Sequence, residues 1–253
     1  MKKKSIVSAL FVLLISMLLA LPAQVSADAI PTDPYYGETV TVGLYDPIPP
    51  GWVLTGNFTM MYVGGASYGD RISILTESPL PADWVLVNYD SYHYKWDAVY
   101  VGGASFGDTE WIATESRVPA EWVYTGYDSW SHNYEITYVG GADYNDMVSG
   151  VLPESPLPTG WVRTGYYSYG NTYELTYTVG AEYLDTISIV AESPVPEGWA
   201  KTGYDSYHNR YELTYTVGAS YGDTISITRE SPLPEGWIIT FLGWLSHRIT
   251  YIG

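Results

Sequence analysis

Polar and apolar residues alternate in short runs along most of the chain. In residues 223–228, Ile225 and Ile227 alternate with polar residues, and in residues 211–217 Tyr, Leu, Tyr and Val recur at every second position. A period of two indicates β-strands with one buried face. A third strand is expected to begin at a tryptophan, as in residues 122–127. No apolar stripe of helical period follows residue 27, so we predict an all-β fold.

These runs belong to a tandem repeat of about 38 residues. Six tryptophans mark the copies, at Trp52, Trp84, Trp122, Trp161, Trp199 and Trp237. After a short lead, residues 28–35, six units tile the chain as one domain: 36–67, 68–105, 106–143, 144–182, 183–220 and 221–253. Because one such unit is too small to bury its own apolar face, neighbouring units must complete the core.

The two end units keep the core pattern, with Val40 and Val42 in the first and Ile249, Tyr251 and Ile252 in the last. An open stack would be expected to end in distinct polar caps, so this pattern favours closure into a ring. We therefore expect a six-bladed β-propeller, although about 38 residues is short for a four-stranded blade. A pair of three-unit β-prisms or barrels is the alternative.

The first 27 residues have the order of a secretory signal peptide. Lys2, Lys3 and Lys4 precede an apolar run at residues 6–21, and residues 25–27 supply the small side chains of a cleavage site. The apolar run is shorter than the ~20 residues of a membrane-spanning helix. We expect cleavage after Ala27 and a secreted, extracellular protein with a bacterial type of export signal.

Composition narrows the range of partners. After removal of the signal, eight basic residues remain against 28 acidic ones, a net charge of −20. Such a surface repels nucleic acid and anionic membranes, so neither nucleic-acid binding nor membrane insertion is expected. The chain has no cysteine, so its stability must come from packing rather than from disulfides.

We expect no enzyme activity, because no nucleophile, zinc or phosphate-loop motif interrupts the repeat.

Four histidines recur, one per unit, in what reads as the same turn: His93, His132, His208 and His247. Their spacing of about one unit argues against a shared metal site. The repeated Asp70, Asp108, Asp146, Asp185 and Asp223 are interpreted as turn carboxylates that cap backbone N–H groups, with Ca²⁺ ligation as the alternative. A hydrolase centred on Glu110 or Glu154, which differ between units, is a less favoured hypothesis.

The turn after each tryptophan strand carries the most informative chemistry. Aromatic rings lie there beside Asp, Ser, Asn and His, which is the combination that a neutral sugar needs for stacking and for hydrogen bonds. We predict sugar sites in units two, three and five, at Asp90, Tyr92 and His93, at Asp128, Trp130 and His132, and at Asp205, Tyr207 and His208. An equally weighted alternative is that these residues only pack between units and close a hairpin, since turns favour Asp, Ser and Asn. Unit one lacks the turn, and unit six has a divergent one.

Each unit also resembles the half-repeat of DM9-type proteins. The resemblance is carried by Pro196-Glu197-Gly198, Gly203-Tyr204-Asp205-Ser206, Tyr215-Thr216-Val217-Gly218-Ala219 and Gly222-Asp223. This chain departs from the DM9 pattern at the position after Val-Gly, where DM9 proteins carry an arginine. The DM9 group includes mannose-recognising lectins, so the resemblance implies a lectin, with glycans of a cell wall, capsule or host surface as partners. The expected function is therefore multivalent carbohydrate binding, and the alternative is a structural or surface-interaction protein without a small ligand.

Overall fold

A computed structural model describes residues 30–43 and 46–253, and the expected signal peptide lies outside these ranges. Within them the chain is all-β, with 18 strands and no α-helix. Accordingly, no helix in the described part has the length and apolarity needed to span a membrane. The strands of units one to three are β1 (Thr39–Thr41), β2 (Trp52–Gly56), β3 (Thr59–Tyr62), β4 (Arg71–Leu75), β5 (Trp84–Asp90), β6 (Lys95–Tyr100), β7 (Thr109–Ala113), β8 (Trp122–Asp128) and β9 (Asn133–Tyr138). Those of units four to six are β10 (Met147–Val151), β11 (Trp161–Tyr167), β12 (Thr172–Tyr177), β13 (Thr186–Val190), β14 (Trp199–Asp205), β15 (Arg210–Tyr215), β16 (Thr224–Thr228), β17 (Trp237–Leu242) and β18 (Ser246–Tyr251).

The strands form six three-stranded antiparallel sheets, and each sheet draws its strands from a single predicted unit. In every sheet the third strand lies between the first and the second, as in the order β4-β6-β5. The second and third strands form a hairpin, and the prolines between the first and second strands make an extended connector outside the sheet. The three strands expected in each unit are therefore observed.

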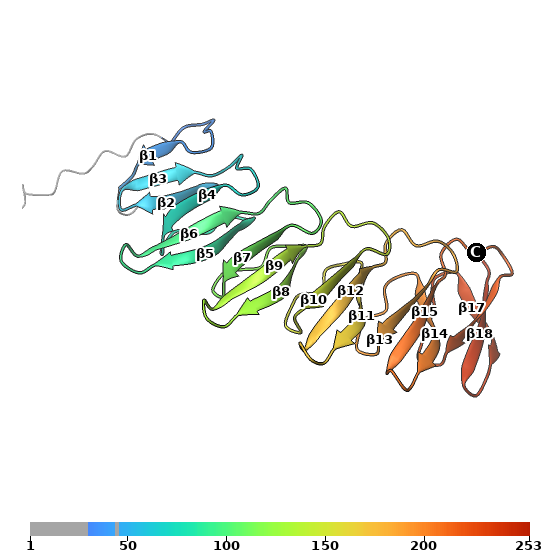
Figure 1. The fold of residues 1–253 in the computed structure, drawn as a ribbon. Helices are drawn as coiled ribbons and strands as arrows, with labels where there is room; N and C mark the ends of the chain where they lie inside the picture. Colours follow the sequence, from blue (N-terminus) through green and yellow to red (C-terminus); the bar gives the residue numbers. More distant parts are fainter. Residues whose placement is uncertain (1–29, 44–45) are drawn as a thin grey trace, which may run out of the picture.

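The six sheets follow one another in an open row, with β1 and β18 at opposite ends (Figure 1). Over the described residues, the strand contacts between units join only neighbours in sequence, such as β5 with β7 and β14 with β16. The expected ring, and with it the six-bladed propeller or the paired prisms, is not what the structure shows. The end units keep a core pattern for another reason: Val40 and Val42 are buried by Trp52 and Met60 of their own unit.

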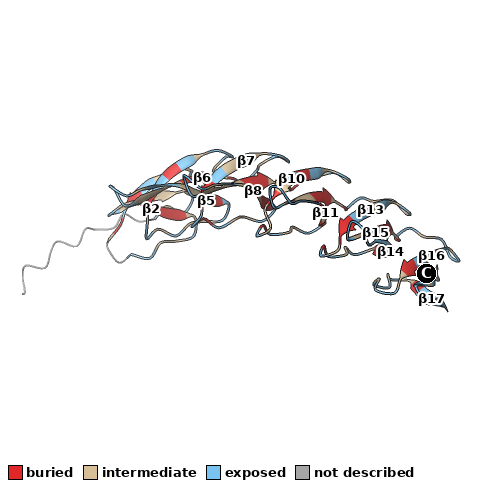
Figure 2. Cartoon of the chain, turned by 60° about the horizontal axis from the view of Figure 1, so that its bottom comes forward, coloured by how far each residue is buried: buried red, intermediate tan, exposed pale blue. Residues whose placement is uncertain are grey.

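Each unit has a tryptophan at its centre, and from unit two onward the core is shared with the preceding unit. All six repeat tryptophans are buried, and each packs against a tyrosine of the adjacent strand, as Trp199 packs against Tyr215 with ring centroids 5.2 Å apart. The residue after the tryptophan enters the next core, where Val162 of unit four meets Ile189, Trp199 and Leu213 of unit five. Buried segments consequently recur along the whole row (Figure 2).

The junctions between units are held by a Glu-Ser pair, which is followed by proline at four of the five junctions and by Arg117 at the other. At all five junctions a serine hydroxyl accepts the backbone N–H two residues after the preceding tryptophan, at 2.8–2.9 Å: Ser78 from Leu54, Ser116 from Leu86, Ser155 from Tyr124, Ser193 from Arg163 and Ser231 from Lys201. The neighbouring glutamate reaches back as well, since Tyr173 donates its hydroxyl to Glu192 at 3.1 Å. These bonds satisfy edge-strand groups that would otherwise lie unpaired beneath the next unit.

Candidate functional site

The hairpins between the second and third strands project along one side of the row (Figure 1). In units two to six the tip of each hairpin carries an aromatic side chain that is almost fully exposed: Tyr92 85%, Trp130 93%, Tyr169 106%, Tyr207 89% and Trp244 88%. Single hydrophobic residues scattered over a surface need no explanation. These rings differ from scattered residues because one recurs at the hairpin of each of five consecutive units. The sequence predicted sites at three of these tips but not at Tyr169, which has the same position in its turn, nor at Trp244, which lies in the shorter, divergent turn of unit six.

The turns of units two and five share one geometry. In unit two, Asp90 Oδ1 accepts the backbone N–H groups of Tyr92 and His93 at 2.9 and 3.1 Å, and Asp90 Oδ2 lies 2.6 Å from His93 Nδ1. Asp205, Tyr207 and His208 repeat this arrangement. The aspartate thus holds the turn and orients the imidazole, so its role in the turn is structural.

This pairing determines which atoms face outward. A carboxylate at Nδ1 favours the proton on that nitrogen, which leaves Nε2 of the neutral imidazole as an acceptor. No hydrogen bond to Nε2 of His93 or His208 is found within the described residues. The tip ring stands edge-on to the imidazole, with centroids 4.8 Å apart for Tyr92 and His93. The hydrogen bond from the His93 side chain is the main reason that the pKa of Asp90 lies below its ordinary value of 3.8.

Unit three differs from this pattern. Asp128 accepts the Trp130 N–H at 2.9 Å and the Ser131 hydroxyl at 2.7 Å, so Ser131 stands where the other two units have histidine. His132 occupies the next position, with a left-handed φ of 55°, and its Nδ1 lies 3.1 Å from the Tyr127 hydroxyl. Asp128, Trp130 and His132 lie in one turn, but its polar groups are arranged differently.

The sequence suggested that the four histidines occupy the same turn of their units. The structure shows that they do not. His247 lies within strand β18 rather than in the turn, opposite Leu242 of β17. Its Nδ1 atom is buried and has no hydrogen-bond partner in the described part of the chain.

A second aromatic layer lies below the tips, where Tyr204 packs on Tyr211 with ring centroids 4.9 Å apart. The amino group of Lys201 lies 3.7 Å from the centroid of the Tyr211 ring. In unit five a shallow depression of about 460 Å³ opens beside this layer, and its lining includes Tyr204, Asp205 and Arg210. The other residues that line the depression are mainly polar or charged, among them Ser188 and Glu212.

The repeated carboxylates before each first strand cap backbone N–H groups, as one of the two interpretations held. Asp223 Oδ2 accepts the Ser220 N–H at 2.8 Å, and Asp70, Asp108, Asp146 and Asp185 make the same bond. In the described residues no group of three or more His, Asp or Glu side chains converges as a metal site would require. Of the two glutamates considered for hydrolysis, Glu110 forms an ion pair with Arg71 of the neighbouring unit, with atoms 3.2 Å apart.

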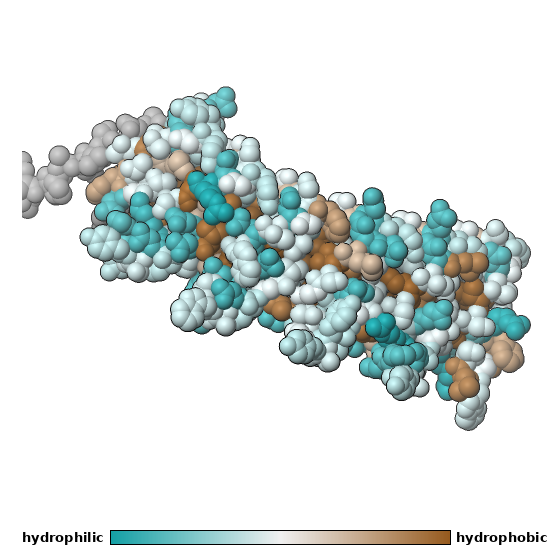
Figure 3. Space-filling view, viewed as in Figure 1, coloured by the Kyte–Doolittle hydropathy of each residue, from teal (hydrophilic) through white to brown (hydrophobic). Residues whose placement is uncertain are grey.

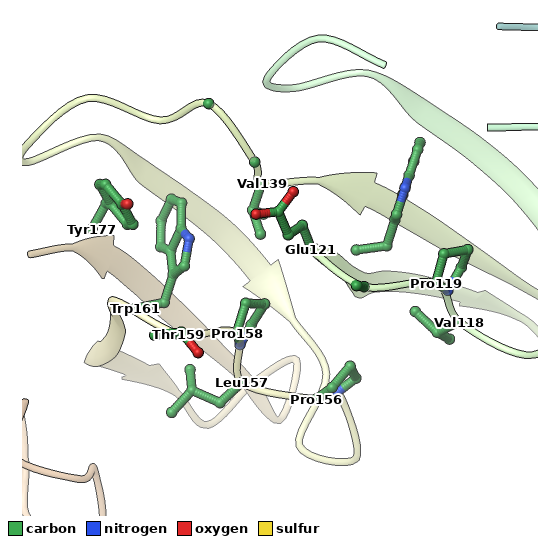
Figure 4. A pocket seen from close by; sticks show the side chains of 14 residues that line it. Val118, Pro119, Glu121, Val139, Pro156, Leu157, Pro158, Thr159, Trp161 and Tyr177 are labelled. Carbon is green, nitrogen blue, oxygen red and sulfur yellow. The ribbon is translucent and has the colours of Figure 1, made fainter. Parts of the chain in front are cut away.

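The structure also contains a groove that the sequence did not predict. It lies between the proline connectors of units three and four, has a volume of about 400 Å³, and is lined by Pro119, Glu121, Pro158 and Trp161 among others (Figure 4). A groove of about 500 Å³ recurs beside Trp199 in the next units. The repeated Pro-x-Pro segments were its only sequence sign, because a concave surface between two connectors depends on how neighbouring units pack.

No protein-family model matches the chain, and neither a curated protein nor a solved structure is significantly similar to it. The resemblance to DM9-type proteins therefore stays a prediction.

Proposed function

We propose that this chain is a secreted, multivalent carbohydrate-binding protein whose sites are the hairpin tips. The observation that carries the proposal is the row of almost fully exposed aromatic rings, one at each tip of five consecutive units. Packing between units does not account for these rings, because each is about as exposed as an isolated side chain. The buried repeat tryptophans already supply the aromatic packing.

The chemistry of the turns suits a neutral sugar. The exposed face of Tyr92 or Tyr207 offers an apolar surface to the C–H face of a pyranose ring. The outward Nε2 of His93 or His208 accepts a hydroxyl proton, while the aspartate keeps the imidazole in that tautomer. The histidine, not the aspartate, then makes the direct polar contact, because the carboxylates of Asp90 and Asp205 are engaged in hydrogen bonds within the turn.

Each site is open and shallow, so its own affinity should lie near the millimolar range, about −4 kcal/mol. A polymer or a glycan-coated surface engages several tips of the row at once, and effective concentration then raises the overall affinity by orders of magnitude. Cell-wall, capsular and host-surface glycans are repetitive polymers of this kind. The high negative charge favours neutral over acidic glycans.

The test is a titration of the mature chain, residues 28–253, with a panel of neutral mono- and oligosaccharides and with immobilised polysaccharides. The key variant combines Tyr92→Ala, Trp130→Ala and Tyr207→Ala. We expect it to keep its melting temperature and to lose polysaccharide binding by at least about 100-fold, since avidity multiplies the loss at single sites.

The matched control is Tyr221→Ala, which removes an equally exposed tyrosine, 83% accessible, from the start of a unit instead of a hairpin tip. It should bind as the unaltered protein does. Unchanged binding by a folded triple variant would move the site elsewhere, with the connector groove as the next place to examine. Failure of the unaltered protein to bind any glycan would favour the alternative, a structural or surface protein without a small ligand.

A further inference from the structure

The last unit exposes a position that is buried in every other unit. The residue after the repeat tryptophan has no exposed surface in units one to five, where it is Val53, Val85, Val123, Val162 and Ala200. In unit six it is Ile238, which is 42% exposed in the described structure. Strand β17 is hydrogen-bonded on one side only, to β18, as is the second strand of every other sheet; in those units, however, the first strand of the next unit packs beside the second strand.

The sequence of β17 is also more apolar than that of its counterparts. Ile239, Phe241 and Leu242 stand where unit five has Lys201, Gly203 and Tyr204. They are 44%, 61% and 70% exposed, and Trp244 and Leu245 extend the apolar surface at the turn. Hydrophobic atoms are visible on the surface of this end of the row (Figure 3). The end of the row is therefore a distinct apolar surface. Its apolar character comes from the residues of β17 themselves and not only from the absence of a packed strand beside it.

We propose that this surface joins two copies of the chain, tail to tail, by antiparallel pairing of β17 with the β17 of a second copy. At the five internal junctions the equivalent strand lies beside a strand of the same protein, as β14 lies beside β16, although the two sheets are not joined by a continuous ladder. A six-stranded sheet across the two copies would bury Ile239, Phe241 and Leu242 and would remove the exposed edge.

The opposite end of the row does not offer a matching partner. The first unit already buries its own core residues, Val40, Val42, Trp52 and Met60, at 0–7% exposure. It therefore has no exposed apolar pocket that could accommodate Ile238. Pairing of like ends is self-complementary about a two-fold axis and closes at two copies, whereas head-to-tail pairing would continue into filaments.

Charge points to the same pairing. The net charge of the chain after the signal is −20. Residues 221–253, by contrast, hold two arginines and three acidic residues, so their net charge is only −1. Strand β17 itself contains no charged residue. Two strongly acidic molecules therefore approach each other with the least repulsion through this unit.

The experiment is sedimentation equilibrium of the mature chain over a wide concentration range, on the unaltered protein and on the double variant Ile239→Lys with Phe241→Gly. These replacements are the residues that unit five carries at the same positions, so the unit should fold. We expect a monomer–dimer equilibrium for the unaltered protein and a dissociation constant at least about 100-fold higher for the variant, as for removal of central interface contacts. Tyr221→Ala, in the same unit but outside β17, should leave the dimer unchanged.

A cross-link reports the geometry independently. The chain has no cysteine, so Thr240→Cys in β17 places a single thiol on each copy. A short bis-maleimide should then capture the dimer, while Ser129→Cys at a distant hairpin should not be captured. A monomer at every concentration, growth beyond two copies, or a dimer unaffected by the double variant would each overturn the proposal. So would a monomer whose β17 surface binds phosphatidylcholine vesicles instead.

Discussion

The hydroxyl of Ser193 lies 2.9 Å from the backbone nitrogen of Arg163, which belongs to the preceding unit. This bond recurs at all five junctions and satisfies an edge N–H that the next unit covers. Replacing Ser193 by alanine leaves that N–H without a partner. We expect the free energy of unfolding to fall by about 1–3 kcal/mol, which is the cost of a buried unsatisfied polar group.

The measurement is urea unfolding followed by tryptophan fluorescence. Ser188→Ala provides the control, because Ser188 belongs to the same unit but lies exposed on β13. It should change stability by less than about 0.5 kcal/mol. Equal effects of the two substitutions would show that the serine hydroxyl does not hold the junction.

The two classes of tryptophan should respond in opposite ways to truncation. Trp161 is 3% exposed and packs on Tyr177, so Trp161→Ala should cost about 3–5 kcal/mol by opening a cavity in the core. Trp130 is 93% exposed, and Trp130→Ala should leave the melting temperature almost unchanged while it weakens glycan binding. A Trp161→Ala protein of full stability that loses only ligand binding would reverse the two roles.

An open row predicts that loss of the first unit has only local consequences. A chain that starts at Tyr68 should fold, because units three to six keep all their neighbours and unit two keeps unit three. Its unfolding m-value should be lower by about one sixth, since m scales with the surface exposed on unfolding. Only unit two should be weakened, because Val53 no longer packs against Ile72 and Trp84.

Urea titration and circular dichroism of the truncated chain test this expectation. A closed ring would instead lose its closing contact, and the whole domain would be destabilised. Global unfolding of the truncated chain would therefore contradict the open arrangement of the sheets.

The strands and the repeat could be predicted because they depend on local signals. Period-two runs and the six tryptophans mark three strands in each unit whatever surrounds them. The order of the units in space could not be predicted in the same way. A ring was inferred from the core residues of the end units, but a unit such as 36–67 buries Val40 and Val42 against its own Trp52. A complete core in an end unit thus carries no information about closure.

The hairpin chemistry was predictable in part. The turns and their polar and aromatic residues follow from composition, but the role of each carboxylate depends on spacing. Histidine lies three residues after Asp90 and Asp205, and its ring reaches the carboxylate; it lies four residues after Asp128, and it does not. The role of the junction serine, which follows a glutamate in each unit, could not be predicted because its partner lies about 30 residues earlier, in another unit.

The difference in spacing leads to a prediction about pH. The hydrogen bond from the His208 side chain is the largest cause that lowers the pKa of Asp205 below its ordinary value of 3.8, followed by the His208 backbone N–H. A carboxyl with a lowered pKa in the folded state contributes stability above its ordinary pKa and loses that contribution as the pH falls through the lowered value. The turn of unit five should therefore keep its structure at pH 4 and loosen only at lower pH.

The check is an NMR titration of the aspartate carboxyl carbons. Asp205 should titrate with a midpoint below 3.8, and His208→Ala should move that midpoint upward, because the main hydrogen bond is lost while the backbone bonds remain. Asp128 supplies the comparison. The largest cause of its lowered pKa is the Ser131 hydroxyl, and His132 acts only through its charge as the smallest contribution. His132→Ala should consequently shift Asp128 much less than His208→Ala shifts Asp205. Equal shifts in the two turns would mean that the imidazole of unit five is not held by its aspartate, and the orientation of Nε2 on which the sugar contact depends would then be lost.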